Sequence, residues 1–202
     1  LSSIFSLSLN QLKVKKIEGL LLHNSKDWLY PETKIFIEHI IKTGKINSFG
    51  LSIYDENDIH IDENISVLQI PGNIFNQQIF YSDKINNFQK NHGIIHIRSI
   101  FIQGLLLMKP ESIPQKLDIL RKPLANIHRI AHEINIDITT LAFLCIKKLM
   151  PTAKVIIGLD DINQAHKLLN INNKLVSEHD LDEVIKFGLK NQNKYWDPRN
   201  WK

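Results

Sequence analysis

The sequence has little of several features that define whole classes of protein. A single cysteine, Cys145, excludes a disulfide framework and a structural zinc site built from several cysteines. No uninterrupted apolar run approaches the roughly 20 residues that a membrane-spanning helix needs. The first residues lack a basic segment followed by a long apolar stretch and a cleavage site, so no secretion signal is predicted. We therefore expect a cytoplasmic protein that does not enter a membrane.

The sequence also lacks a large excess of positive or negative charge. Among 202 residues, 25 Lys and Arg face 21 Asp and Glu, which gives a formal net charge of +4 spread along the chain. Nucleic-acid binding would need a basic stripe with interleaved aromatic side chains, and none is seen. We expect no nucleic-acid partner. The densest basic group, Lys13, Lys15 and Lys16, is interpreted as a solvated helix end or turn.

Several catalytic and ligand-binding motifs are missing. The sequence contains no GxSxG, no Walker A loop and no GxGxxG. His128 and His132 have helical i,i+4 spacing, but no Glu lies between them in the arrangement that zinc proteases use. We therefore expect no metal site.

Apolar runs and helical patterns alternate along the chain, which is the rhythm of an α/β protein with a parallel sheet. The predicted strands are Ile17–Leu22, Ile46–Ile53, Ile65–Ile70, Ile94–Phe101 and Lys154–Ile157. The predicted helices include Pro31–Thr43, Asp83–Asn91, Pro114–Ile134, Ile138–Leu149, Ile162–Leu169 and His179–Leu189. Pro123 lies within one of these patterns and predicts a kink or a junction of two helices there.

No linker or low-complexity segment divides the sequence, so we expect one domain over residues 1–202. Two architectures are compatible with the pattern: an open doubly wound sheet, or part of a (β/α)₈ barrel. A full barrel usually takes about 250 residues and eight strands. The five predicted strands are too few to close one.

Function in parallel α/β folds lies at the carboxyl ends of the strands. The predicted strands end at His23, near Ser52, at Gln69, near Arg98 and Ser99, and at Gly158. A polar side chain at such a position is costly unless it is used or is bonded locally. His23 follows three leucines and is the best catalytic candidate, because a neutral imidazole there could donate a hydrogen bond to a substrate oxygen.

The segment from Val155 to Gln164 has a strand that ends at Gly158 and a helix that opens near Asp161. Exposed amides at such a helix start can receive a phosphate group. The alternative is purely structural, with Asp161 as an N-cap and Gly158 permitting the turn.

Taken together, these stretches resemble the aldo/keto reductase family over essentially the whole chain. Glu18-Gly-Leu-Leu-Leu-His23 resembles the strand that ends in the family's catalytic His, and Gly44-Lys-Ile-Asn-Ser-Phe-Gly-Leu-Ser52 resembles its "GKI…GvS" strand. Val67-Leu-Gln-Ile-Pro-Gly-Asn73 resembles its strand with Gln and Asn. Arg98-Ser99 with Gln103-Gly104-Leu105-Leu106 is similar to "RSxFxQGLLL", and Val155–Gln164 resembles the "VIPGaxxxxQ" cofactor loop.

The resemblance implies a parallel (β/α)₈ TIM-barrel type of α/β fold, here N-terminally incomplete with about five of eight strands. It implies hydride transfer between NAD or NADP and the carbonyl of a small aldehyde or ketone. By resemblance His23 orients the carbonyl, Ser52 and Gln69 hold the nicotinamide carboxamide, and Arg98 and Ser99 line the cofactor trough. The adenosine phosphate end is implied to be lined by Gly158, Leu159, Asp160 and Gln164.

The sequence also departs from the family pattern. The family's Tyr acid, Lys and Asp have no counterpart here, and Ile53, Ile157 and Leu168 stand where Asn, Pro and Asn are usual. Asp160 would repel a 2′-phosphate at close range, which favours NAD over NADP. The leading hypothesis is a fragment of an NAD(P)-dependent oxidoreductase. The alternatives are a non-catalytic regulatory or binding subunit with a degenerate reductase barrel, and an unrelated open α/β domain. The oligomeric state is not predicted.

Overall fold

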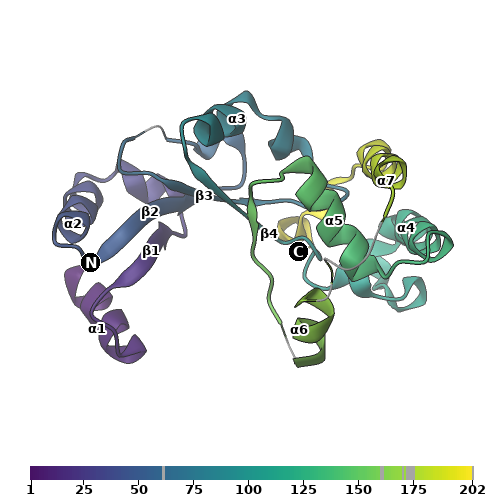
Figure 1. Cartoon of the computed structure of the whole chain (residues 1–202), viewed down its shortest axis with the longest axis horizontal. Coiled ribbons are helices and arrows are strands. Elements are labelled where there is room, and N and C mark those ends of the chain that lie inside the picture. Colours follow the sequence, from purple (N-terminus) through teal and green to yellow (C-terminus); the bar gives the residue numbers. More distant parts are fainter. Residues whose placement is uncertain (61, 160–161, 170, 172–175, 202) are drawn as a thin grey trace. The chain divides into compact units, whose positions relative to one another are not determined.

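The computed structural model describes residues 1–60, 62–159, 162–169, 171 and 176–201. Strands and helices alternate through most of the chain (Figure 1). The strands are β1 (Ile17–Leu22), β2 (Ile46–Ser52), β3 (Val67–Pro71), β4 (Ile94–Arg98) and β5 (Lys154–Val155). The α-helices are α1 (Ser2–Leu12), α2 (Pro31–Lys42), α3 (Asp83–Lys90), α4 (Arg121–Glu133), α5 (Ile138–Leu149), α6 (Ile162–Leu169) and α7 (Glu178–Lys190).

The five strands form one parallel sheet in the order β1-β2-β3-β4-β5. Each strand therefore neighbours the strand that follows it in the sequence. A doubly wound sheet would reverse its strand order at a switch point, whereas successive strands of a TIM barrel are added in sequence order. The order of the strands thus selects the barrel type of the two architectures that the sequence left open.

The packing of the chain divides into two compact units. The first comprises Leu1–Ile70 and Ser82–His96, and the second comprises Pro71–Tyr81 and Ile97–Lys202. The single domain expected over residues 1–202 stays a prediction.

In the first unit, α2 and a short 3₁₀ turn, η1 (Ser25–Leu29), cover β2. Ile37 and Ile40 of α2 are buried, because they lie one helical turn apart on one face. Trp28 of η1 is also buried, and its ring lies 5.0 Å from that of Phe49 on β2. These apolar side chains of α2 and η1 therefore cover one face of β2.

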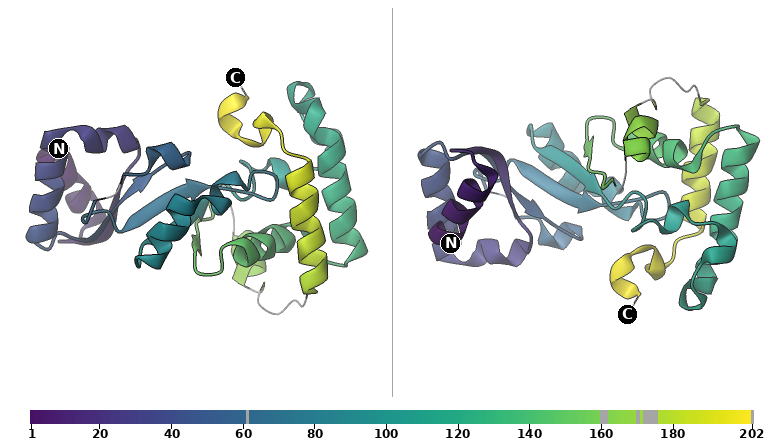
Figure 2. Two further views of the ribbon diagram at one scale, coloured as in Figure 1. Left: turned by 90° about the horizontal axis from the view of Figure 1, so that it is seen from above. Right: turned by 90° about the horizontal axis from the view of Figure 1, so that it is seen from below.

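In the second unit, α4, α5 and α7 pack around a single apolar cluster. Leu124 and Ile127 of α4, Cys145 of α5 and Val184 of α7 are all fully buried in it. Figure 2 shows α4 and α7 running side by side. At the surface, Lys148 of α5 forms ion pairs with Glu178 and, at 2.8 Å, with Asp182 of α7.

Most of the observed boundaries differ by a few residues or less from those expected. β4 ends at Arg98 instead of Phe101, because Ser99 and Ile102 have left-handed backbone angles (φ 67° and 53°) that turn the chain out of the sheet. Two helices meet close to Pro123, which is one of the two outcomes expected: the 3₁₀ helix η6 (Gln115–Leu120) ends directly before α4 begins at Arg121. Pro123 is the third residue of α4, in the first turn, where an amide has no intrahelical partner to lose.

Within the part of the chain that the structure describes, no helix is both long enough and apolar enough to span a bilayer.

Candidate functional site

Three polar residues lie near the carboxyl ends of neighbouring strands: His23 follows β1, Ser52 is the last residue of β2, and Gln69 is the middle residue of β3. In the last common row of the three strands, Leu22 pairs with Leu51, and Leu51 pairs with Leu68. One residue further on, Ser52 pairs with Gln69, and His23 is the next residue of the first strand's chain. Partners in a parallel pair project on the same face, so the side chains of Ser52 and Gln69 share one face of the sheet.

A turn directly after His23 takes the backbone out of the sheet, so that His23 is not paired with β2. Asn24 accepts a hydrogen bond from the amide of Lys26 at 3.2 Å, and its side-chain amide donates to Asp27 at 3.1 Å. This Asx turn opens η1 and ends strand pairing at Leu22. As a result His23 is exposed at the strand tip, the position expected of a residue that meets a substrate.

Ser52 and Gln69 lie deeper in the sheet. Ser52 is the last residue of β2 and is buried, whereas Gln69 is the third residue of β3 and is half-buried between fully buried Leu68 and Ile70. The strands are very close here. A Cβ on Gly50 would lie 2.3 Å from the carbonyl oxygen of Val67, so no larger residue fits. A hydroxyl and a carboxamide are therefore held side by side on closely paired strands.

Arg98 and Ser99 lie in the second unit, where β4 ends. The carbonyl oxygen of Arg98 accepts a hydrogen bond from the amide of Gly72 at 3.0 Å. The loop that follows is strained, because Ser99, Ile102 and Gln103 all have positive φ. The fully buried side chain of Ile102 anchors the loop in the apolar cluster and offsets that strain. The buried Ile102 side chain thus holds the loop after β4 against the second unit.

The C-terminal tail also belongs to the second unit and packs near the residues that follow β3. Asn73 donates a hydrogen bond to the carbonyl oxygen of Trp196 at 3.3 Å, and the indole of Trp196 stacks on Phe75 with ring centroids 4.0 Å apart. The next residue is Asp197. Burial alone would raise the pKa of its carboxyl group, but hydrogen bonds from Arg199 and the charges of Arg199 and Arg98 outweigh burial and lower it.

Reasoning from the sequence did not predict that the charge of Arg98 acts on Asp197. The only hint in the sequence is an acidic residue within the aromatic tail, between Trp196 and Pro198. From its composition this tail is expected to pack on the outside of the barrel or near a substrate opening. The structure shows Trp196 fully buried in the apolar cluster of the second unit.

The remaining candidates follow β5. The amide of Ile156 donates to the carbonyl oxygen of Ile97 at 2.7 Å, which extends the pairing of β5 with β4 by one residue. Gly158 and Leu159 come next and are exposed, and a Cβ on Gly158 would meet no atom within 4 Å. Gln164 is half-buried on α6. Asp160 and Asp161 lie outside the described residues.

The chemistry of these side chains is that of hydrogen bonding. His23 offers a ring N–H, Ser52 a hydroxyl, and Gln69 a carboxamide with both a donor and an acceptor. Among the described residues, no group of three or more His, Cys, Asp or Glu side chains is arranged to hold a metal ion. The structure brings His23, Ser52 and Gln69 together in the first unit, and Arg98, Ser99, Gly158, Leu159 and Gln164 belong to the second.

Comparisons with known structures agree on the fold. The chain is similar to an aldose reductase from Giardia lamblia, with 14% identity and a TM-score of 0.69 over 99% of this chain and 71% of the other. It is similar to an aldo/keto reductase from Klebsiella pneumoniae in complex with NADP and acetate, with 17% identity and a TM-score of 0.68 over 94% and 64%. It is also similar to the thermostable aldo-keto reductase Tm1743 in complex with the inhibitor epalrestat, with 17% identity and a TM-score of 0.68 over 91% and 64%.

Identities this low show a shared fold alone, and they confirm the TIM-barrel type expected from the sequence. The chain spans 64% of the length of the Klebsiella pneumoniae protein and of Tm1743. A search of curated proteins found no match. The sequence model of the Aldo/keto reductase family matches residues 2–187. Because this match extends over nearly all of the sequence, the chain belongs to the aldo/keto reductase family.

Proposed function

We propose that this chain is part of an oxidoreductase that moves hydride between a nicotinamide dinucleotide and the carbonyl of a small aldehyde or ketone. In this proposal the chain supplies His23 and the cofactor-binding residues of the active site. The observation that supports this most directly is that Ser52 and Gln69 are register partners on β2 and β3, and that His23 directly follows the neighbouring strand β1. Family membership and the TIM-barrel type of fold are consistent with it.

The residues present fit a nicotinamide group. A carboxamide needs both a donor and an acceptor, and Gln69 with the neighbouring Ser52 hydroxyl provides both. In this proposal Arg98 and Ser99 line the cofactor trough. Gly158, Leu159, Asp160 and Gln164 line the adenosine phosphate end, where the open space at Gly158 permits close approach of a phosphate. When bound, the dinucleotide supplies the hydride.

The role of His23 follows from its position. An exposed imidazole at the strand tip would donate a hydrogen bond to the carbonyl oxygen of the substrate and orient it, and it would stabilise negative charge that develops on that oxygen. The proton that completes the reduction needs a separate acid. No position of this sequence matches the family's Tyr, so in our proposal this acid lies outside these 202 residues.

The test is nicotinamide-dependent reduction of a simple aldehyde by the full-length protein. His23→Ala should lower kcat by about 10²-fold or more, the range expected for loss of a positioned proton-bonding group. His132→Ala is the matched control, because His132 is exposed on α4 and follows no strand. Equal activity of the two variants would show that His23 has no catalytic role. Tight dinucleotide binding without turnover of any carbonyl would favour the non-catalytic binding subunit.

Our proposal of NAD over NADP depends on one residue, Asp160. A carboxylate at Asp160 would repel a 2′-phosphate, so we propose NAD as the preferred form. The Klebsiella pneumoniae protein was solved with NADP, so comparison of NADH and NADPH affinities decides the point. Asp160→Ser should then improve NADPH binding selectively, and an unchanged ratio would contradict the proposal.

A further inference from the structure

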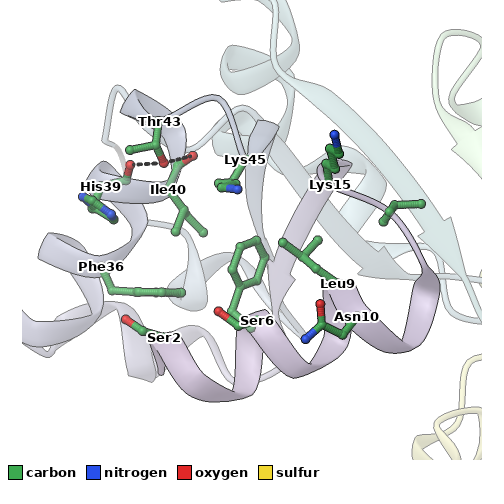
Figure 3. A pocket seen from close by; sticks show the side chains of 12 residues that line it. Ser2, Ser6, Leu9, Asn10, Lys15, Phe36, His39, Ile40, Thr43 and Lys45 are labelled. Carbon is green, nitrogen blue, oxygen red and sulfur yellow. Dashed lines mark hydrogen bonds between the residues drawn. The ribbon is translucent and has the colours of Figure 1, made fainter.

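A cavity of about 410 Å³ lies in the first unit (Figure 3). His23, Ser52 and Gln69 do not line it. It opens between α1 and α2, beside the segments that lead into β1 and β2. These are the amino-terminal ends of the strands, whereas His23 follows the carboxyl end of β1. Six residues of extended strand separate the two ends, about 20 Å.

One part of the cavity is apolar. Phe5 and Leu9 line it from α1, and Figure 3 shows Phe36 and Ile40 on the α2 side. The rings of Phe5 and Phe36 meet edge to face with centroids 5.8 Å apart. Helical spacing explains this wall, since Phe5 and Leu9 are i,i+4 on α1 and Phe36 and Ile40 are i,i+4 on α2. The volume is within the range of small-molecule sites.

The other part is basic. Lys15 lies just before β1 and Lys45 just before β2, and the two segments are tied together by a hydrogen bond from the amide of Ile17 to the carbonyl of Lys45 at 3.0 Å. No carboxylate lines the cavity. In the part of the chain that the structure describes, neither lysine ammonium has an ion-pair or hydrogen-bond partner. Two like charges without a counter-ion attract an anion.

We propose that this cavity binds a small amphipathic carboxylate, with its hydrocarbon part against the paired rings of Phe5 and Phe36 and its carboxylate between Lys15 and Lys45. The hydrocarbon part would remove apolar surface of both helices from water. The carboxylate would supply the counter-charge that the two lysines lack. The lysines by themselves would also suit the nearby ends of α1 and α2, where cations favour the helix dipole, so the experiment has to separate these two roles.

The probe is octanoate, titrated into the full-length protein by isothermal calorimetry, with octan-1-ol as the uncharged counterpart. We expect saturable one-to-one binding of octanoate and at least tenfold weaker binding of the alcohol. Lys15→Gln combined with Lys45→Gln should weaken octanoate at least tenfold. Lys13→Gln combined with Lys16→Gln removes the same charge from two lysines that are exposed, as Lys15 and Lys45 are, but do not line the cavity. This double variant should change the affinity less than twofold.

A second pair of variants tests the cavity itself. Ser6 lines the cavity and Ser3 does not, and both are exposed on α1. Ser6→Leu should fill the space and abolish octanoate binding, whereas Ser3→Leu should leave it unchanged. Leucine favours helix more than serine does, so both variants should fold, and thermal melts check this. Absence of octanoate binding, equal affinity for the alcohol, or equal effects of the two members of either variant pair would overturn the proposal and leave the lysines a role at the helix ends only.

Discussion

Ser52 and Gln69 are register partners on neighbouring parallel strands, and the amide that follows Ser52 donates a hydrogen bond of 2.9 Å to the carbonyl oxygen of Gln69. The backbone of the two residues is thereby held in one geometry. Their side chains project on the same face of the sheet, next to the position of His23. A hydroxyl and a carboxamide that are fixed in this way need little reorganisation to bind a polar ligand.

The first prediction tests this pair. Gln69→Leu keeps the size of the side chain but removes its donor and acceptor, so under the proposed function the affinity for the nicotinamide dinucleotide should fall by about two- to tenfold, the value of one ordinary hydrogen bond. Ser52→Ala should have a similar effect. Fluorescence titration of NADH measures it. Gln11→Leu, at an exposed glutamine of α1, is the control. Affinities equal to that of the control would place the dinucleotide elsewhere.

The second prediction contrasts two glycines. A Cβ on Gly188 of α7 would lie 2.0 Å from the carbonyl oxygen of Ile74 and 2.8 Å from the side-chain nitrogen of Gln77. Gly188→Ala should therefore lower the free energy of unfolding by about 1–3 kcal/mol, the cost of an overpacked contact. Gly158→Ala meets open space and should leave stability unchanged. Urea unfolding measures both, and a fully stable Gly188→Ala would show that α7 does not approach Ile74 so closely.

The third prediction concerns the tail. Trp196 is fully buried, stacks on Phe75, and donates from its indole nitrogen to the carbonyl oxygen of Asn191 at 2.8 Å. Trp196→Ala should cost about 3–5 kcal/mol of stability. Trp201 is only half-buried, so Trp201→Ala should cost clearly less. Thermal or denaturant melts rank the two. If Trp196→Ala were as mild as Trp201→Ala, the tail would not be an integral part of the second unit.

The fourth prediction concerns the lone thiol. Cys145 lies within α5 with no exposed surface, and burial raises its pKa to about 12, although the charge of Lys148 acts in the opposite direction. The thiolate is the reactive species, so the native protein should react very slowly with a disulfide reagent at a pH of about 8. Addition of denaturant should make the reaction fast. Rapid labelling of the native protein would contradict the burial of α5.

The sequence by itself determined which segments form strands, because five short apolar runs alternate with amphipathic patterns. It also placed polar side chains at or near the ends of the first four strands, from His23 to Ser99. Those positions follow from local properties of the chain: hydrophobic periodicity, turn-forming residues and breakers such as Pro71-Gly72.

Only the tertiary structure decided how these residues are combined. The register that aligns Ser52 with Gln69 depends on packing between strands, and a slip by one residue would turn one of them to the opposite face. The early end of β4 depends on burial of Ile102, and the place of Trp196 depends on Phe75, far from it in sequence. Such contacts join distant parts of the chain, and no local pattern contains them.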